Sequence, residues 1–264
     1  MQPAENSSEE SNTNFTWQNI IDWAQTHYRD RIFHKDEQIP ARPQLIYLVN
    51  QGAVRLVSQT KNVTPEMLEI NLAEAELDLL EESFLGFVGV EKPFEIVTQS
   101  SFQIQAYAHV DETHIAWLYW QDLKNWPGFR QQLYEVFRYQ HQRKLLWLSA
   151  LGQRKTIDRL TSFLTLLLEE YGVEQQEYCC LPYSLTHAQI GSAIGSTRVT
   201  VTRLMGKLRR QGIIKVRSDN SICINSLKLL EANQNNNYLT DFTPRFRSKL
   251  AITKSYFKVA SKLY

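Results

Sequence analysis

The sequence predicts an α+β fold in which a β-rich N-terminal part, a long central helix and a C-terminal winged helix-turn-helix follow one another. Three observations predict it. Short runs that alternate apolar and polar residues recur between residues 30 and 123. A long helical pattern then begins at Pro127. Two helices with N-terminal caps, separated by a glycine, occupy residues 185–210.

Charge is divided unevenly along the chain. The formal net charge of the 264 residues is only +1. Residues 1–130 nevertheless hold 9 Lys and Arg against 19 Asp and Glu, whereas residues 181–264 hold 14 against 3. An acidic N-terminal part and a basic C-terminal part indicate that only the C-terminal part binds a polyanion.

The sequence shows neither a targeting segment nor a membrane span. It contains no apolar run of about 18 residues, and its polar start lacks the basic and apolar stretches of a signal peptide. We therefore expect a cytoplasmic protein that does not contact a membrane. Cys179, Cys180 and Cys223 fit neither a disulfide framework nor a zinc-ligand spacing. We expect buried or bystander thiols and no metal or cofactor, with a redox role for the adjacent pair as the alternative.

The N-terminal part is expected to form a sensor-like domain over residues 15–125, preceded by a disordered tail at residues 1–14. The tail lacks apolar residues to bury, and residues 15–28 have the spacing of a short helix. Strand-like runs then flank a turn at Asn50-Gln51-Gly52 and continue toward residue 123. Several short strands at this spacing predict an all-β roll or barrel.

A long helix is predicted within residues 126–152, with Pro127 in its first turn. One stripe of this helix follows the alternating four- and three-residue steps of a coiled coil. The stripe consists of Leu133, Phe137, Gln140, Lys144, Trp147 and Leu151. We interpret it as a dimer seam, and packing of the helix on its own domain is the alternative. The polar members Gln140 and Lys144 would fix the register or contact a buried ligand.

Residues 153–228 are predicted to form a winged helix-turn-helix domain. Thr186 and Gln189 have the spacing of a capping box, which would open a helix over residues 187–194. Gly195 can supply the left-handed turn that follows.

The second helix of the motif is predicted to begin after a cap at Ser196 and to end near Arg210. At about 100° per residue, its apolar side chains gather on one face. These are Val201, Leu204, Met205 and Leu208. Side chains that point away from this face can enter the major groove of DNA. These are Arg198, Val199, Thr202 and Arg203.

The exposed face carries groups that suit nucleic-acid recognition. An arginine can bond guanine O6 and N7, and a valine can touch a thymine methyl. Hydroxyl groups, the N–H groups of a helix start and a basic wing residue suit phosphates. The candidate phosphate contacts are Thr186, Ser196, Thr197, Thr200 and Arg217, the last beside a predicted hairpin turn at Asp219-Asn220. We therefore predict binding to double-stranded DNA; a solvated amphipathic helix is the alternative.

On these residues, the chain resembles the CRP/FNR family of bacterial regulators from about residue 30 to 228. The stretch IGSTRVTVTRLMGKLR is especially similar to the family's cyanobacterial nitrogen-regulator branch. The resemblance implies a cupin-like β-roll of the cyclic-nucleotide-binding type, a dimerisation helix, a homodimer and base-reading roles for Arg198, Val199 and Arg203. It also implies a palindrome near GTA…TAC, read through the major groove, and RNA polymerase as a further partner.

The sensor departs from the family pattern. Where cyclic-nucleotide-binding members have a Gly-Glu-Leu turn and a later arginine, this chain reads SFLGFVG and then Gln103. The same position is an arginine where the nitrogen regulators bind 2-oxoglutarate, and an anion without that clamp is hard to hold. No cysteine precedes residue 179, as an iron–sulfur branch member would need. We expect none of these three inputs. Gln103 and Lys144 are candidate contacts for an unrecognised effector, and the absence of any effector is the alternative.

Two other functions compete with transcriptional regulation. The winged helix could mediate protein contact in a signal-binding module. An enzyme is not expected, because the six histidines are scattered without a catalytic or metal-binding arrangement. Residues 229–264 add a basic and aromatic extension that could contact flanking DNA, pack on the body or stay disordered.

Overall fold

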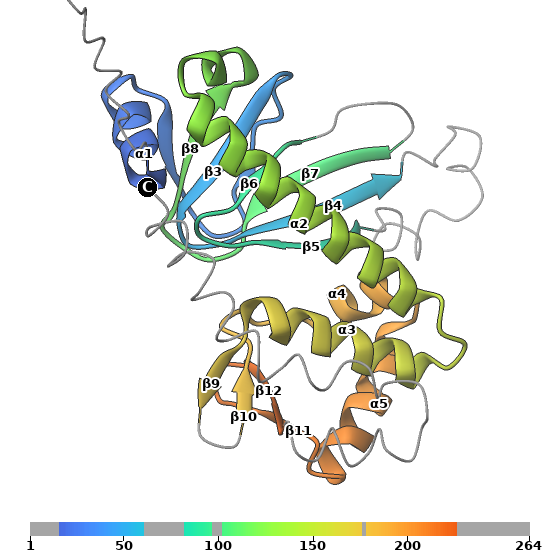
Figure 1. The fold of residues 1–264 in the computed structure, drawn as a ribbon. Coiled ribbons are helices and arrows are strands. Elements are labelled where there is room, and N and C mark those ends of the chain that lie inside the picture. The colour runs from blue at the N-terminus through green and yellow to red at the C-terminus, as the bar shows by residue number, and fades with distance from the viewer. Residues whose placement is uncertain (1–15, 61–81, 97–101, 176–177, 226–264) are drawn as a thin grey trace, which may run out of the picture. The chain divides into compact units, whose positions relative to one another are not determined.

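The computed structural model describes residues 16–60, 82–96, 102–175 and 178–225 (Figure 1). The tail predicted at residues 1–14 and the extension predicted at residues 229–264 lie outside the described residues.

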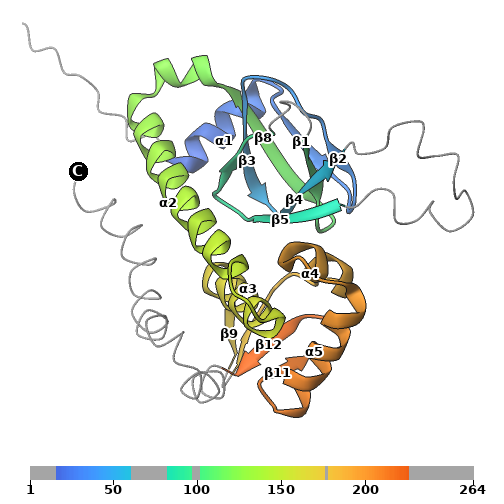
Figure 2. The ribbon, with the colours of Figure 1, turned by 90° about the vertical axis from the view of Figure 1, so that its right-hand side faces the viewer.

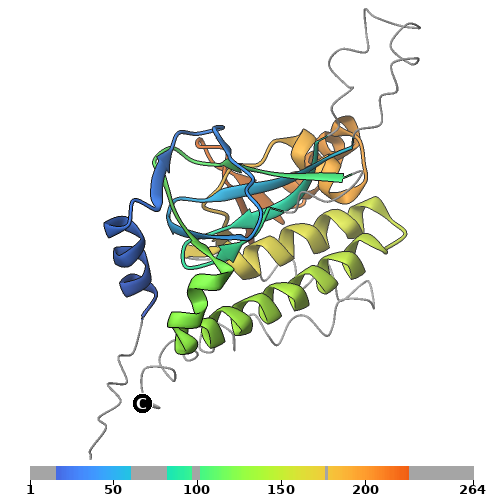
Figure 3. The ribbon, with the colours of Figure 1, turned by 90° about the horizontal axis from the view of Figure 1, so that it is seen from above.

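The chain divides into two compact units, and the boundary falls inside the long helix, between Arg143 and Lys144. Residues Glu81–Phe84 also belong to the second unit. Helix α2 (Pro127–Leu151) runs without interruption through this boundary (Figure 3). The sequence predicts a separate segment for this helix, whereas in the structure the two compact units share it.

Two four-stranded sheets form the body of the first unit, except for the first residues of one edge strand, which belong to the second unit (Figure 2). Their strand orders are β1-β8-β3-β6 and β2-β7-β4-β5. The strands are β1 (Asp30–Phe33), β2 (Gln38–Ile39), β3 (Leu45–Gln51), β4 (Val54–Thr60), β5 (Glu82–Val88), β6 (Pro93–Phe94), β7 (Phe102–Ala108) and β8 (Thr113–Tyr119). Helix α1 (Trp17–Thr26) precedes them, and a 3₁₀ helix, η2 (Trp120–Asn125), leads into α2. The predicted β-roll is confirmed.

Strand β3 is buried on both faces. Tyr47 and Val49 lie in a core cluster drawn from both sheets. Ile46 and Leu48, which alternate with them, join a second cluster with residues of α1 and α2, including Leu133. A strand covered on both faces reads as a continuous apolar run, which is the IYLV stretch of the sequence.

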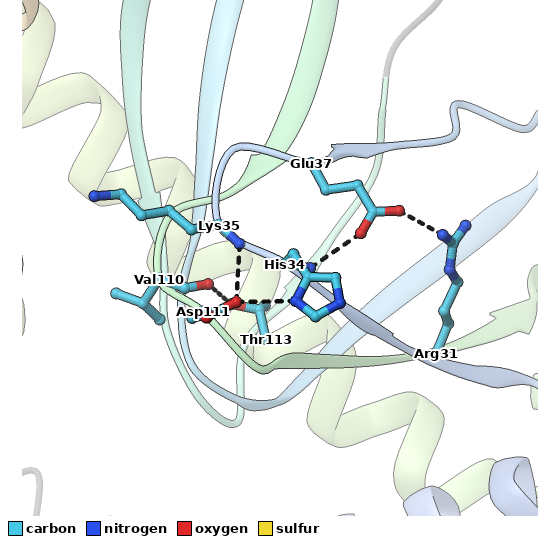
Figure 4. A network of polar contacts seen from close by, with 7 residues as sticks. All are labelled: Arg31, His34, Lys35, Glu37, Val110, Asp111 and Thr113. Carbon is cyan, nitrogen blue, oxygen red and sulfur yellow. Dashed lines mark hydrogen bonds and ion pairs between the residues drawn. The ribbon is translucent and has the colours of Figure 1, made fainter.

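A polar network ties together two turns of the first unit (Figure 4). Asp111 accepts hydrogen bonds from the ring Nδ1 of His34 at 3.1 Å and from the backbone N–H of Lys35 at 3.3 Å. The first bond, followed by the second, lowers the pKa of the Asp111 carboxyl. Glu37 pairs with Arg31 and also accepts from the His34 N–H at 3.0 Å. These exposed contacts fix the β1–β2 turn against the β7–β8 turn.

The stripe of α2 predicted as a dimer seam packs within the chain, so that prediction is wrong for its best-placed members. Leu133 is fully buried in the second core cluster, and Phe137 packs against the same cluster. Gln140 donates from Nε2 to a backbone carbonyl of the first unit at 3.0 Å. Within the second unit, Trp147 contacts Phe163 edge-on, with ring centroids 5.0 Å apart. A coiled-coil period is compatible both with a dimer seam and with packing on the helix's own domain. For these residues, the contacts within the chain show the second.

In the described residues, the second unit contains the end of α2, three further helices and a small sheet. Its elements after α2 are α3 (Thr156–Tyr171), β9 (Val173–Gln175), β10 (Tyr178–Cys180), α4 (His187–Ile194), α5 (Arg198–Arg210), β11 (Ile214–Val216) and β12 (Ile222–Asn225). The four strands form one sheet in the order β11-β12-β10-β9, which we call the wing sheet. Helix α3 supplies a nearly continuous apolar body that includes the fully buried Leu160 and Leu164.

The structure corrects the expectation that all three cysteines are thiols. Cys180 and Cys223 lie directly opposite each other on β10 and β12 and form a disulfide. Cys179 is a free, buried thiol. The alternative expectation gives a redox role to the neighbouring Cys179 and Cys180. In the structure, Cys180 is instead bonded to Cys223, because the register of β10 and β12 places these two residues side by side.

Candidate DNA-binding site

Helix α4 begins and ends where the sequence predicts. The Thr186 hydroxyl accepts the N–H of Gln189 at 3.1 Å, and the Gln189 side chain accepts the N–H of Thr186 at 3.0 Å. This reciprocal capping box satisfies two N–H groups that would otherwise lack helical partners. Gly195 ends the helix in the left-handed conformation, with φ 62° and ψ 53°. These local features turn the chain toward α5.

Helix α5 is capped one residue later than predicted. Thr197, not Ser196, has the extended N-cap conformation, and its hydroxyl accepts the N–H of Thr200 at 3.2 Å. Ser196 still belongs to the turn, because its own N–H donates to the Gly191 carbonyl at 2.8 Å. Gly212, with φ 68°, follows the end of the helix. The helix thus starts at Arg198 and presents it in the first turn.

One face of α5 packs on the domain and the other is exposed (Figure 2). Val201, Met205 and Leu208 are buried, while Leu204 is only half-buried. The side chains on the opposite side are exposed: Arg198, Val199, Thr202 and Arg203. Val199 has 78% of its surface exposed. The exposed side of α5 therefore combines two guanidinium groups, a hydroxyl group and a branched apolar side chain.

His187, which the sequence pattern did not place in the site, lies beside the exposed side of α5. The ring Nδ1 of His187 is 2.8 Å from the Thr202 hydroxyl, which itself donates to the Arg198 carbonyl at 2.9 Å. Burial, and then the charges of Arg198 and Arg209, lower the pKa of His187. The Thr202 hydroxyl therefore already has partners in the protein, and its base-reading role stays a prediction. The only sequence signal for His187 was its place directly after the Thr186 cap.

Arg159 on α3 is a second residue that the sequence pattern did not reveal. Its Nε donates to the Ile194 carbonyl at 2.9 Å, and its guanidinium also donates to the Gln153 carbonyl at 3.1 Å. A guanidinium satisfies carbonyls that the end of α4 leaves without helical partners. Arg159 thereby fixes the end of α4 to α3.

The wing is a tight turn between β11 and β12. The Arg217 N–H donates to the Ser221 carbonyl at 3.1 Å, and the Asn220 N–H donates to the Arg217 carbonyl at 3.0 Å. Asn220 adopts φ 62°, a conformation that asparagine tolerates better than most residues. The Asp219 carboxylate accepts the Ser221 N–H at 2.9 Å, and bonds to Ser221 lower its pKa. The hairpin expected at Asp219-Asn220 is present, and Arg217 is exposed at its base.

The proposed effector contacts lie in different units. Gln103 is a half-buried residue of β7 in the first unit, and Lys144 belongs to the second. The Lys144 ammonium lies 5.6 Å from the centre of the Trp147 ring. Desolvation lowers the pKa of Lys144 although part of its side chain remains exposed, and the Glu170 carboxylate opposes the shift. A shared ligand for Gln103 and Lys144 stays a prediction.

Membrane-spanning helices and metal-binding clusters are both absent from the described residues. No helix there is long and apolar enough to cross a membrane. No group of three or more His, Cys, Asp and Glu side chains in the same residues could hold a metal ion.

The segment that holds this site matches proteins of known family. Residues 158–232 match the Crp-like helix-turn-helix domain. The chain is 36% identical over 84 residues to the global nitrogen regulator of Synechococcus elongatus, and 41% identical over 71 residues to that of Nostoc sp.. These matches cover 32% and 27% of this chain and 38% and 32% of the two relatives. The chain thus matches only about a third of the length of these curated relatives.

The fold as a whole is also found among solved structures. A CRP-family transcriptional regulator from Thermus thermophilus is similar over 78% of this chain and 97% of its own, with a TM-score of 0.56 and 17% identity. At this identity, the likeness shows a shared fold.

Proposed function

We propose that this chain, a regulator of the CRP/FNR type, binds double-stranded DNA as a homodimer and reads a palindrome near GTA…TAC through the major groove. One observation carries the proposal. Val199 is 78% exposed between Arg198 and Arg203, on the side of α5 opposite its buried residues. Polar residues alone would suit a merely solvated face, whereas this combination suits base edges.

Each exposed group on α5 matches a feature of the major groove. Arg198 and Arg203 can each bond the O6 and N7 atoms of a guanine, and Val199 can contact the methyl group of a thymine. The helix start is suited to phosphate, because its first N–H groups and the positive end of the helix dipole favour an anion there. Thr197 and Thr200 lie at that end. Arg217 on the wing would add a phosphate contact that positions the domain.

A second copy would pack along an exposed stripe of α2. Tyr134, Leu145 and Leu148 expose 51%, 52% and 63% of their surfaces. Together with the exposed Arg138 and His141, they follow the four- and three-residue steps of a coiled coil, one residue further along than the stripe that contains Leu133. Two-fold symmetry of the protein would then match two half-sites about one DNA turn apart. RNA polymerase, as a further partner, is implied only by the family resemblance.

The DNA-binding proposal is tested by fluorescence anisotropy with a duplex that carries GTA…TAC and with a scrambled duplex. Arg203→Ala should cost about 1–3 kcal/mol of discrimination between the two. The matched control is Arg31→Ala, which removes the same charge from an exposed pair of the first unit, and it should leave discrimination unchanged. No binding of either duplex at low salt would contradict the proposal and favour the alternative in which the winged helix contacts protein.

The dimer is tested separately by analytical ultracentrifugation. The double variant Leu145→Asp, Leu148→Asp should sediment as a monomer, because buried unpaired carboxylates would oppose association. Ile32→Asp serves as a control, since Ile32 is 49% exposed in the first unit. A wild-type protein that is already monomeric at the concentrations used for DNA binding would show that the stripe is not a dimer surface.

The proposed regulator does not sense cyclic nucleotide, 2-oxoglutarate or an iron–sulfur cluster. The support is that the half-buried Gln103 stands where an anion would need an arginine, and that all three cysteines lie at or after residue 179. An unrecognised small ligand near α2, or no effector, are the remaining alternatives. Calorimetric titration with cyclic AMP and 2-oxoglutarate should show no heat of binding, and saturable binding of either would refute this part.

A further inference from the structure

The Cys180–Cys223 disulfide lies on the face of the wing sheet away from the helical core. Successive strand residues point to opposite faces of a sheet. Cys179, next to Cys180, points toward α3, where its Sγ is 4.0 Å from the Leu168 carbonyl. Cys180 therefore faces the other side, and Cys223 lies directly opposite it in the register of β10 and β12.

The disulfide lines a hollow of about 350 Å³ whose wall is basic. Its lining residues are Gln175, Tyr178, Cys180, Lys215, Arg217 and Cys223. The Lys215 ammonium is 5.9 Å from the centre of the Tyr178 ring, and Arg217 donates to the Gln175 amide oxygen at 2.5 Å. Two of these described lining residues are cationic and none is acidic. The hollow therefore favours an anion next to the two sulfur atoms.

We propose that Cys180 and Cys223 form a reversible thiol–disulfide site, that Lys215 and Arg217 attract a small anionic thiol or its disulfide to it, and that its redox state controls DNA affinity. In the oxidising direction, one cysteine thiolate attacks a sulfur of the small disulfide and releases one small thiolate. The second cysteine then attacks the mixed disulfide and releases the other. The protein loses two protons and two electrons, and the small disulfide becomes two thiols.

The chemistry favours this pair over Cys179. Burial, followed by the nearby Glu174 carboxylate, raises the pKa of Cys179 to about 11, so its thiolate is scarce near neutral pH. Cys180 and Cys223 expose only 4% and 2% of their surfaces, but they line the hollow with Lys215 and Arg217, whose charges attract an anionic reagent. Exchange should therefore leave Cys179 untouched.

The disulfide also encloses the DNA-binding motif. The two cysteines are 43 residues apart in sequence, and the loop between them contains α4, α5 and the wing. Reduction would let β10 and β12 separate at this point.

A separation of β10 and β12 would affect α5 through a single residue, Ile213. The Ile213 N–H donates to the Leu208 carbonyl of α5 at 3.0 Å, and the Ile213 carbonyl accepts the Asn225 N–H from β12 at 2.9 Å. The end of the recognition helix is thus hydrogen-bonded through one residue to the strand that carries Cys223. The effect on DNA affinity rests on the proposed function; the thiol chemistry does not.

The first experiment follows the chemistry without DNA. The full chain is equilibrated with mixtures of reduced and oxidised glutathione, an anionic thiol couple, and its thiols are then trapped by alkylation and located by mass spectrometry. We expect a two-electron transition confined to Cys180 and Cys223. Lys215→Gln with Arg217→Gln should slow exchange with glutathione several-fold, but not exchange with uncharged 2-mercaptoethanol. A pair that resists both reagents, or a disulfide that includes Cys179, would overturn the proposal.

The second experiment measures DNA affinity of the oxidised and reduced wild type by anisotropy. We expect reduction to weaken binding about three- to tenfold, through lost preorganisation of the loop. Cys179→Ser should keep this dependence, and Cys223→Ser should bind like the reduced protein in either condition. Equal affinity of the two forms would refute redox control, whereas no binding of either form would refute the proposed function and leave the exchange result standing.

Discussion

Gly191 lies in α4 where the two helices of the motif meet, and alanine in its place should distort the turn that presents the recognition helix. A Cβ at this position would lie 2.7 Å from the Ser196 carbonyl oxygen and 3.3 Å from the carbonyl carbon of Thr197. Both contacts are with backbone, which cannot swing aside as a side chain can. The start of α5, including Arg198, would have to move instead.

The size of the effect follows from two opposing contributions. Overpacking costs about 1–3 kcal/mol, while alanine in a helix interior gains about 1 kcal/mol over glycine. Gly191→Ala should therefore lower the free energy of unfolding by up to about 2 kcal/mol. Because the displaced segment carries the base-reading arginine, DNA affinity should fall more than stability alone explains.

Gly206 on α5 supplies the matched control. A Cβ there would meet only the end of the flexible Arg210 side chain, at 3.7 Å. Gly206→Ala should therefore raise the free energy of unfolding by up to about 1 kcal/mol. The measurement is urea unfolding followed by circular dichroism, with DNA anisotropy on the same samples. If Gly191→Ala unfolded at the same urea concentration as Gly206→Ala or later, the steric reading of this turn would be wrong.

Three further predictions concern the same unit. Thr197→Ala removes the cap of α5 and should cost about 1 kcal/mol in urea unfolding; Ser196→Ala should cost less, and the reverse order would contradict the cap assignment. The folded-state pKa of His187 lies below its usual value of 6.5, so the unfolded chain takes up this proton first and stability should fall as pH drops below about 6.5. His187→Gln should flatten that part of the pH profile, and an unchanged slope would argue against the assignment. Replacing both Cys180 and Cys223 by alanine should lower stability by about 4 kcal/mol under non-reducing conditions, from the loop entropy of a 43-residue separation; equal melting of this variant and the oxidised wild type would show that the disulfide contributes nothing.

The helix-turn-helix could be predicted almost residue by residue because its signals are local. The capping box at Thr186, the left-handed Gly195 and the stripe on α5 each depend on residues within a few positions of one another. The cap of α5 was misplaced by one residue because Ser196 and Thr197 carry equivalent hydroxyl groups. The structure separates them, since the Thr197 hydroxyl accepts the Thr200 N–H.

His187 and Arg159 could not be found in this way. Their roles depend on partners 15 and 35 residues away in sequence, Thr202 and Ile194. A histidine after a helix cap and an arginine in a helix are both common surface residues, so neither carries a signal until the helices are packed.

By itself, the sequence determined that the chain combines a β-roll, a long helix and a winged helix-turn-helix, and which side of α5 is exposed. These follow from periodicity and capping, which act within one element. Only the tertiary structure decided which stripe of α2 is buried and that Cys180 pairs with Cys223. Both depend on contacts between residues far apart in the chain. Two neighbouring stripes of α2 have the same coiled-coil period, so the period alone cannot tell which one is buried. The register of β10 and β12, and not the spacing of cysteines in the sequence, decides which sulfur atoms meet.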